Sequence, residues 1–376
     1  MRIAHVSDCY APRTGGIESQ VAALAQRQVA AGRDIRVITA TPGRHVRSGI
    51  DTVDGVPVHR ITAHLPADLP IHPRTRRAVV GVLRSDPVDI VHVHAGVISP
   101  FAWGAVRAAR ELGIPVLVTV HSVWGAMSSP VFRASDALAR WSSWGVTLSA
   151  VSTLAAQRVQ RAVPQGAPVL VIPNGIDPEQ WRVPRREVSA ERMHVVTVMR
   201  LAPRKRALPW VRMVALARQG LHGQIDLTAT VVGDGPMRER AQRLARSLGL
   251  ADALEFTGRL DRAGVLQELG RADAYVQPSV KESFGLAALE ARASGLPVIV
   301  RAQSGSTEFI HDGVEGLVAS DDPGMVAALV RLGLDPGLRQ RIADHNESTP
   351  PDESWANVLD IVDDAYASAV ERAGAR

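Results

Sequence analysis

Two glutamates, Glu282 and Glu290, stand eight positions apart in the stretch VKESFGLAALEARASGLP. The alanines and leucines between them favour a helix from Leu286 to Ala293. Gly285 lies at the junction, where its conformational freedom suits the turn from loop to helix. The free N–H groups and the dipole at the start of such a helix favour an anion, and a diphosphate would fit there. One carboxylate would then lie on each side of the anion.

Carboxylates do not bind phosphate, so hydroxyl groups are their expected partners. We interpret Glu282, on the loop, as a ligand of a sugar, and Glu290, on the helix, as a ligand of a ribose. Together with a diphosphate, this arrangement describes a nucleotide-sugar. The alternative is an amphipathic helix with two solvated glutamates, because glutamate pairs are common on helices.

The bulk properties narrow the class of protein. A chain of 376 residues can form two domains with separate cores, and 46% hydrophobic with 22% charged residues is typical of a soluble globular protein. The single Cys9 excludes an internal disulfide, and a start with a strand pattern rather than a signal peptide predicts a cytoplasmic protein. The net charge of +5 suits an anionic donor or an anionic membrane surface. Nucleic acid is not expected, since the sequence has no zinc finger or RNA-recognition motif.

The order of apolar runs predicts an α/β fold. A strand at Arg2–Ser7, a loop with Gly15 and Gly16, a helix at 17–31 and a strand at 34–39 form a βαβ unit. Later buried strands end at residues that could do chemistry, because the carboxyl ends of parallel strands face the ligand crevice. These residues are His121, Arg200, Lys205 and Gly233.

ESFGLAALEARASGLPVI resembles the E-x7-E signature of the retaining family-four glycosyltransferases. Pro173-Asn174-Gly175-Ile176-Asp177 matches that family closely, and Arg200 and Lys205 fall on its two basic positions. Met199 and Arg206 replace two glycines of the family pattern, which puts the local loop shape in doubt. The resemblance implies the GT-B architecture, which has two Rossmann-like, doubly wound domains facing across a cleft.

The resemblance also implies roles for individual residues. His121 would contact the transferred sugar, and Arg200 and Lys205 would neutralise the diphosphate. Backbone amides at Gly15 and Gly16 would approach the donor. The other expected donor contacts are Gly233, Ser283, Phe284, Gly285, Leu286 and Glu290. Because no Asp-x-Asp motif stands in a matching place, we expect no metal and no cofactor.

The implied reaction moves a sugar from a GDP- or UDP-sugar to a hydroxyl with the anomeric configuration kept, by a front-face mechanism. A sugar-nucleotide epimerase and a non-catalytic sugar-nucleotide binder remain alternatives. The acceptor could be a lipid, a glycan or a small molecule. Tryptophans after His121 could form an acceptor platform, since indole stacks well on sugars; they are Trp124, Trp141 and Trp144.

The expected domains are residues 1–184, which would bind the acceptor, and residues 185–354, which would bind the nucleotide-sugar. A charged, proline-containing stretch at 182–192 is interpreted as the linker. A helix at 355–376 would cross back onto the first domain. The basic amphipathic helix within 70–84 is either a surface helix or a peripheral attachment to an anionic membrane.

Overall fold

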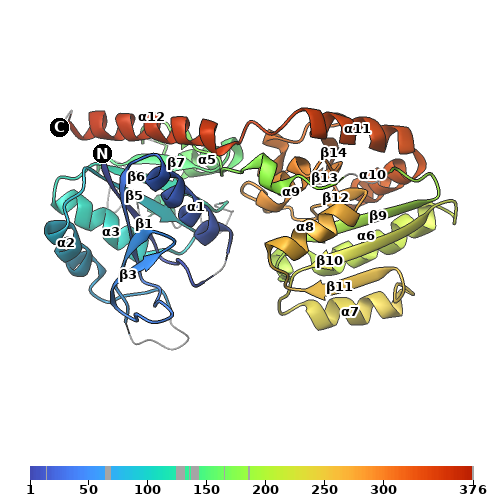
Figure 1. The fold of residues 1–376 in the computed structure, drawn as a ribbon, viewed down its shortest axis with the longest axis horizontal. Coiled ribbons are helices and arrows are strands. Elements are labelled where there is room, and N and C mark those ends of the chain that lie inside the picture. The colour runs from blue at the N-terminus through green and yellow to red at the C-terminus, as the bar shows by residue number, and fades with distance from the viewer. Residues whose placement is uncertain are drawn as a thin grey trace. The chain divides into compact units, whose positions relative to one another are not determined.

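The computed structural model describes residues 1–13, 15–63, 69–123, 132–134, 136, 144–164, 166–184 and 187–374. The chain forms two compact units, one of Met1–Gly175 with Trp355–Arg376 and one of Ile176–Ser354. Both are α/β units built on mainly parallel sheets, as the sequence predicts (Figure 1).

The sheet of the first unit has the strand order β3-β4-β2-β1-β5-β6-β7-β8. All its neighbouring strands pair in parallel except the β3–β4 hairpin at the edge. Its strands are β1 (Arg2–Ser7), β2 (Asp34–Thr39), β3 (Gly49–Val53), β4 (Val56–Arg60), β5 (Ile90–Ala95), β6 (Val116–Val120), β7 (Thr147–Ala150) and β8 (Leu170–Val171).

Helices cover both faces of this sheet (Figure 1). One face packs on α2 (Thr75–Ser85), α3 (Pro100–Glu111) and α5 (Thr153–Ala162). The other packs on α1 (Gly16–Ala30) and α12 (Trp355–Gly374). Strands alternate between the two cores, so that Ala4 and Val6 face α2 and α3 while Ile3 faces α1 and α12.

The basic amphipathic helix is α2, and its apolar side is part of this fold. Val79, Val80 and Leu83 are buried in the core of the first unit. Its arginines are exposed, as on the outer side of any surface helix. The structure therefore favours the surface-helix interpretation, because no apolar side of α2 remains to enter a membrane. No helix among the described residues is long and apolar enough to span a bilayer.

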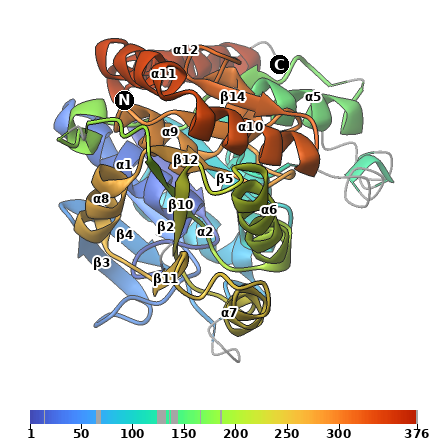
Figure 2. The same cartoon turned by 90° about the vertical axis from the view of Figure 1, so that its right-hand side faces the viewer.

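The second unit has an all-parallel sheet with the order β11-β10-β9-β12-β13-β14. Its strands are β9 (Arg192–Val198), β10 (Asp226–Val232), β11 (Leu254–Gly258), β12 (Ala274–Val276), β13 (Val298–Arg301) and β14 (Gly316–Ala319). Its α-helices are α6 (Ala207–Gly220), α7 (Arg238–Ser247), α8 (Arg262–Arg271), α9 (Leu286–Ala293), α10 (Asp322–Leu334) and α11 (Pro336–Ser348). Figure 2 shows α6 and α8 on opposite sides of β10. Short 3-10 helices are η3 (Pro178–Trp181), η4 (Pro203–Lys205) and η5 (Gly305–Glu308).

The division between the units follows Gly175 rather than residue 184. Residues just after Gly175 already contact the second unit. Ile176 N–H donates to the Glu353 carbonyl at 2.8 Å, and Ser294 Oγ donates to the Trp181 carbonyl at 2.7 Å. Composition indicates a linker at 182–192, but this stretch belongs to the second unit.

Candidate functional site

The second unit places its predicted site residues where the order of its strands reverses. From β9 the chain proceeds to β10 and β11 on one side, and then crosses to β12, β13 and β14 on the other. Arg200 and Lys205 follow β9, and Glu282 follows β12, so they come from the carboxyl ends of the two strands that flank the reversal. Ligands of open α/β sheets bind in the crevice at this point.

Lys205 and Glu282 form an ion pair, with 2.5 Å between Nζ and Oε2. Their side chains are 23% and 15% exposed, so the pair is partly shielded but can still be reached from solvent. Arg200 is exposed and has no ion pair within the part of the chain that the structure describes. The site thus combines a fixed cation, a carboxylate beside it and a second cation open to a ligand.

The loop that carries Glu282 is fastened to the neighbouring η5 segment. Gly305 N–H donates to the Glu282 carbonyl at 2.9 Å, and Ser306 Oγ donates to the Phe284 carbonyl at 2.9 Å. Gly285 has φ +99°, and a Cβ there would overlap Ser306 Oγ, so glycine is required for both reasons. The loop is therefore preorganised by backbone contacts.

The side chain of Phe284 is packed in the core below this loop. Its side chain is 1% exposed and packs on Phe309, with 5.2 Å between ring centroids. The ring therefore anchors the loop in the core, and a donor contact of Phe284 stays a prediction for its backbone. Ser283 and Leu286, in contrast, are partly exposed on either side of it.

The start of α9 provides the expected site for an anion. Ala288 and Leu289 donate to the Gly285 carbonyl at 2.9 and 3.1 Å, so hydrogen bonding within the helix begins with them. The amides of Leu286 and Ala287 precede these bonds, at the positive end of the helix dipole. This is the arrangement that binds phosphate at helix N-termini.

Glu290 lies on α9 and is partly buried. Burial raises the pKa of Glu290 to about 8, although the positive charge of Arg262 opposes the shift. Tyr275, on β12, lies near both carboxylates, since burial and then the charges of Glu282 and Glu290 raise its pKa. Neither Arg262 nor Tyr275 is a predicted site residue. Sequence could have indicated Tyr275 only through its place on the strand before the motif.

The loop after β9 has Met199 and Arg206 at the positions of the two family glycines. Arg206 adopts the left-handed conformation, with φ +66°, that a glycine adopts readily, and it pairs with Asp322 at 2.5 Å. Met199 donates to the Val232 carbonyl at 2.9 Å. Gly233 has φ +132°, and a Cβ there would overlap the Met199 carbonyl, so this glycine permits a close backbone contact. This close backbone contact is a structural reason for a glycine at position 233, in addition to any contact with the donor.

In the first unit, Gly15 and Gly16 form the start of α1, directly after the loop that follows β1. A Cβ at Gly15 would overlap the carboxylate of Glu18, whereas nothing lies near a Cβ at Gly16. The Glu18 side chain therefore folds back against the helix start. Gly15 and Gly16 lie at the carboxyl end of β1, next to β5 at the point where the strand order of this sheet reverses.

His121 follows β6, is partly buried and belongs to a cluster with three buried histidines. His121 Nε2 lies 3.0 Å from His94 Nδ1, and His94 Nε2 lies 3.0 Å from His5 Nδ1. Burial lowers the pKa of His5 and of His121 to about 4, and it lowers the pKa of His92 and His94 well below the usual value. All four rings are therefore neutral at pH 7.

These shifts make the first unit sensitive to acid. In the unfolded chain, His5 and His121 take up protons with the ordinary pKa of 6.5. The free energy of unfolding therefore has its full value above pH 6.5 and falls as the pH drops toward 4. We expect a loss of up to about 3 kcal/mol for each of His5 and His121. Hydrogen exchange of the β1 and β5 amides as a function of pH would measure it in the first unit alone. His45→Gln, at an exposed position, should leave the pH dependence unchanged, whereas equal protection at pH 7 and pH 4.5 would contradict the prediction.

Trp144 does not lie beside His121. Trp144 precedes β7 at the amino ends of the strands, whereas His121 follows β6 at the carboxyl end. The guanidinium groups of Arg110 and Arg107 lie 5.0 and 5.8 Å from the Trp144 ring centroid, and they line a pocket with Arg76. Trp144 therefore lies at the end of the sheet opposite to His121, and its acceptor role stays a prediction. Trp124 and Trp141 lie outside the described residues.

Comparisons with known proteins identify the family. Residues 14–180 match the model of Glycosyltransferase Family 4, and residues 181–348 match that of Glycosyl transferases group 1. A GDP-mannose-dependent alpha-mannosyltransferase of Mycolicibacterium smegmatis is 30% identical over 341 residues, which cover 86% of this chain and 85% of the relative. The chain belongs to the family-four glycosyltransferases. A glycogen synthase of Mycobacterium tuberculosis is 29% identical over 402 residues, covering 98% and 95%.

Solved structures give the same fold for this family-four glycosyltransferase. Anabaena Alr3699/HepE in complex with UDP superposes with a TM-score of 0.75 at 20% identity, covering 98% of this chain and 100% of that one. Sucrose-phosphate synthase from Thermosynechococcus elongatus has a TM-score of 0.75 at 19% identity, covering 97% and 98%. The two Rossmann-like units are thus those of the GT-B architecture, as the sequence predicts, and the enzyme is a glycosyltransferase.

Proposed function

We propose that this glycosyltransferase transfers a hexose from a nucleoside-diphosphate sugar to an acceptor hydroxyl, with retention of anomeric configuration and without a metal. The observation that carries the proposal is the Lys205–Glu282 ion pair at the strand reversal of the second unit, next to the start of α9. This arrangement provides a cation for a diphosphate and a carboxylate for a sugar hydroxyl within one preorganised loop system.

The leaving group is the step that the second unit would assist. As the glycosidic bond breaks, negative charge grows on the diphosphate, and fixed donors aimed at that charge lower the barrier. Arg200, Lys205 and the first amides of α9 would supply this stabilisation. Because these groups provide positive charge themselves, the reaction requires no divalent cation, and added EDTA should leave turnover unchanged.

Retention is proposed to follow a front-face course. The departing diphosphate would take the proton of the acceptor hydroxyl on the same face from which it leaves. His121, a neutral ring at the end of β6, would contact the transferred sugar. Glu282 would hold a hydroxyl of that sugar, and Lys205 would fix the carboxylate at 2.5 Å.

The nucleotide is proposed to be GDP or UDP. One relative is named for GDP-mannose, and one structural neighbour was solved with UDP. Glu290 would bind the ribose hydroxyls, which both nucleotides share. The base would therefore be selected elsewhere, by the loops that follow the strands of the second unit.

A thermal-shift panel of GDP, UDP, ADP and their sugars would identify the donor. A ligand that binds only the folded state at a concentration of 100 times its Kd stabilises it by about 2.7 kcal/mol. We expect one of GDP or UDP to raise the Tm by several degrees, and the others to have little effect. No shift with any nucleotide would contradict the proposed donor class.

The reaction itself is tested by product analysis. The donor selected by the panel is incubated with sugar, inositol and lipid acceptors, and the anomeric configuration of the new bond is read by NMR. An inverted product would overturn the retaining mechanism. Donor incubated alone is the control, because conversion to an epimer would show an epimerase, and binding without any turnover would show a binding protein.

A further inference from the structure

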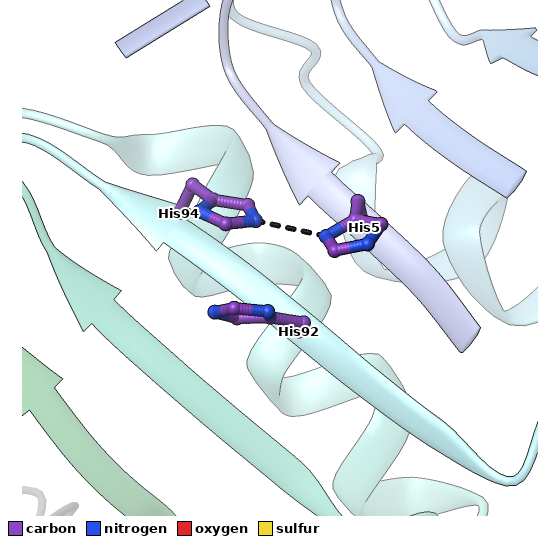
Figure 3. A group of neighbouring side chains, drawn as sticks. All are labelled: His5, His92 and His94. Atoms are coloured by element: carbon purple, nitrogen blue, oxygen red, sulfur yellow. Dashed lines mark hydrogen bonds between the residues drawn. The ribbon is translucent and has the colours of Figure 1, made fainter. Parts of the chain in front are cut away.

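Four histidines form a connected cluster inside the first unit, on the face of the sheet that α1 and α12 cover. His5 lies on β1, His92 and His94 lie on β5, and His121 follows β6. Figure 3 shows the first three, with His5 and His94 joined by a hydrogen bond of 3.0 Å. His5, His92 and His94 are at most 3% exposed. Each neutral imidazole ring carries its proton on only one of its two nitrogens, so the hydrogen bonds of the cluster depend on which nitrogen that is.

A metal ion does not explain the cluster. His5, His92 and His94 place ligand nitrogens close enough to share an ion. However, all six of their ring nitrogens already have polar partners in the protein at 2.7 to 3.0 Å. These are hydrogen-bond distances, and an ion would have to displace several of the partners. The cluster is therefore a hydrogen-bond network.

The direction of the network is determined at one end by a backbone carbonyl, which can only accept. Ser149 Oγ donates to the Val118 carbonyl at 3.3 Å, so Ser149 Oγ accepts from Thr119 Oγ1 at 2.7 Å. Thr119 has then used its proton, and it accepts from His92 Nε2 at 2.7 Å. His92 consequently carries its proton on Nε2, and its Nδ1 accepts from the Tyr366 hydroxyl at 2.9 Å.

Tyr366 transmits this direction to the other histidines. Its oxygen accepts from Gln28 Nε2 at 3.2 Å, which turns Gln28 Oε1 toward His5 Nε2 at 2.7 Å. An amide oxygen only accepts, so His5 is protonated on Nε2 and accepts at Nδ1 from His94 Nε2. His94 in turn accepts at Nδ1 from His121 Nε2, at 3.0 Å.

We propose that this relay from the Val118 carbonyl through Tyr366 and Gln28 holds His121 as the tautomer protonated on Nε2, with Nδ1 as an acceptor. Gln28, His5, His94 and Tyr366 are then positioning residues for His121. The low pKa of His5 and of His121, about 4 for each, keeps the relay neutral at working pH. The tautomer decides which ring nitrogen donates and which accepts where His121 contacts a sugar hydroxyl; this consequence rests on the proposed function of His121.

Nitrogen-15 NMR of histidine-labelled protein measures the tautomers directly, without any substrate. The relay predicts the Nε2–H tautomer for His5, His92, His94 and His121 alike. A network that runs in the opposite direction would give the Nδ1–H tautomer for all four, and that result would overturn the proposal. Broad signals from ring nitrogens bound to a metal would overturn it as well.

Tyr366→Phe separates the two halves of the relay. Gln28 would then lose the acceptor that orients its amide, and we expect mixed tautomers at His5, His94 and His121. In Gln28→Glu, the new carboxylate can only accept from His5. His5, His94 and His121 should therefore keep their Nε2–H tautomers. Tyr10→Phe is the matched control, because the Tyr10 hydroxyl is buried and has no hydrogen-bond partner among the described residues. Unchanged tautomers in Tyr366→Phe would contradict the relay.

Turnover separates this inference from the proposed function. In a serine-protease triad, the wrong tautomer of the catalytic histidine lowers kcat on the order of 10⁴-fold. A mixture of tautomers should cost less, and we expect a kcat loss on the order of tenfold in Tyr366→Phe with little change in KM. If the NMR result is as expected but His121→Ala transfers sugar normally, the proposed role of His121 fails and the relay stands. If His121→Ala is inactive but the wild type shows Nδ1–H, only the relay fails.

Discussion

Lys205→Ala should lower kcat by on the order of a hundredfold or more, with a much smaller change in donor KM, by analogy with the loss of one oxyanion donor. The charge on the diphosphate grows only as the glycosidic bond breaks, so a cation beside it contributes most in the transition state. The Lys205 ammonium is held in place by Glu282 at 2.5 Å, which removes the need to reorganise it during the reaction. Arg200→Ala should have an effect of similar size.

The controls for this experiment come from the same turn. Arg204 is exposed on η4 next to Lys205, and Arg204→Ala should leave kcat unchanged. The turn itself should survive in Lys205→Ala, because it is Arg206 that pairs with Asp322 on α10. Lys205→Arg keeps the charge and should recover part of the activity. Near-normal turnover in both Lys205→Ala and Arg200→Ala would remove these residues from the site.

The sequence predicts the secondary structure around this site well because apolar runs and glycines act locally. Strands with continuous apolar residues, and the glycine before the helix at Leu286–Ala293, require no knowledge of the rest of the chain. The Lys205–Glu282 contact spans 77 positions, and residue types alone cannot predict it. It follows from the strand order, which places the end of β9 beside the end of β12.

The histidine cluster illustrates the same limit. His92 and His94 are two positions apart, so they are expected on one face of a strand. That His5 faces them is a result of the pairing of β1 with β5, where His5 is opposite His92. Trp144 shows a related limit: neighbouring tryptophans in the sequence suggested a platform, but the position of Trp144 before β7 puts it at the end of the sheet opposite to His121. For α2, the sequence pattern cannot tell a protein core from a lipid surface.

Glu290→Ala should raise donor KM far more than it lowers kcat. The ribose hydroxyls keep their contacts from the ground state to the transition state, so their loss is a uniform loss of binding. Glu282 should behave differently, because the transferred sugar flattens and moves as the bond breaks. Glu282→Ala should therefore lower kcat more than it raises KM. Since Glu282 also fixes Lys205, Glu282→Gln is needed beside it, as an amide can still accept from the ammonium.

The pKa of Glu290 makes this assignment measurable by pH. With a pKa of about 8, the free carboxyl is protonated at pH 7. Ribose hydroxyls that donate to it favour the ionised form, so binding should lower this pKa and release a proton below pH 8. Affinity for the nucleoside diphosphate should then rise with pH, by up to about tenfold per unit, and become level above pH 8. Glu290→Gln should lack this component, while the titration of the ligand phosphates remains in both proteins.

Calorimetry with free nucleoside diphosphate, in buffers with different heats of ionisation, measures both the affinity and the proton release. The nucleotide without its sugar should bind the Glu282→Ala variant almost normally and the Glu290→Ala variant poorly. Proton release should be seen in the wild type and in Glu282→Ala, but be reduced in Glu290→Gln. If Glu282→Ala loses the nucleotide while Glu290→Ala keeps it, the two carboxylates have been assigned in the wrong order. Their positions, one on the loop after β12 and one inside α9, would then have to bind the donor in the reverse direction.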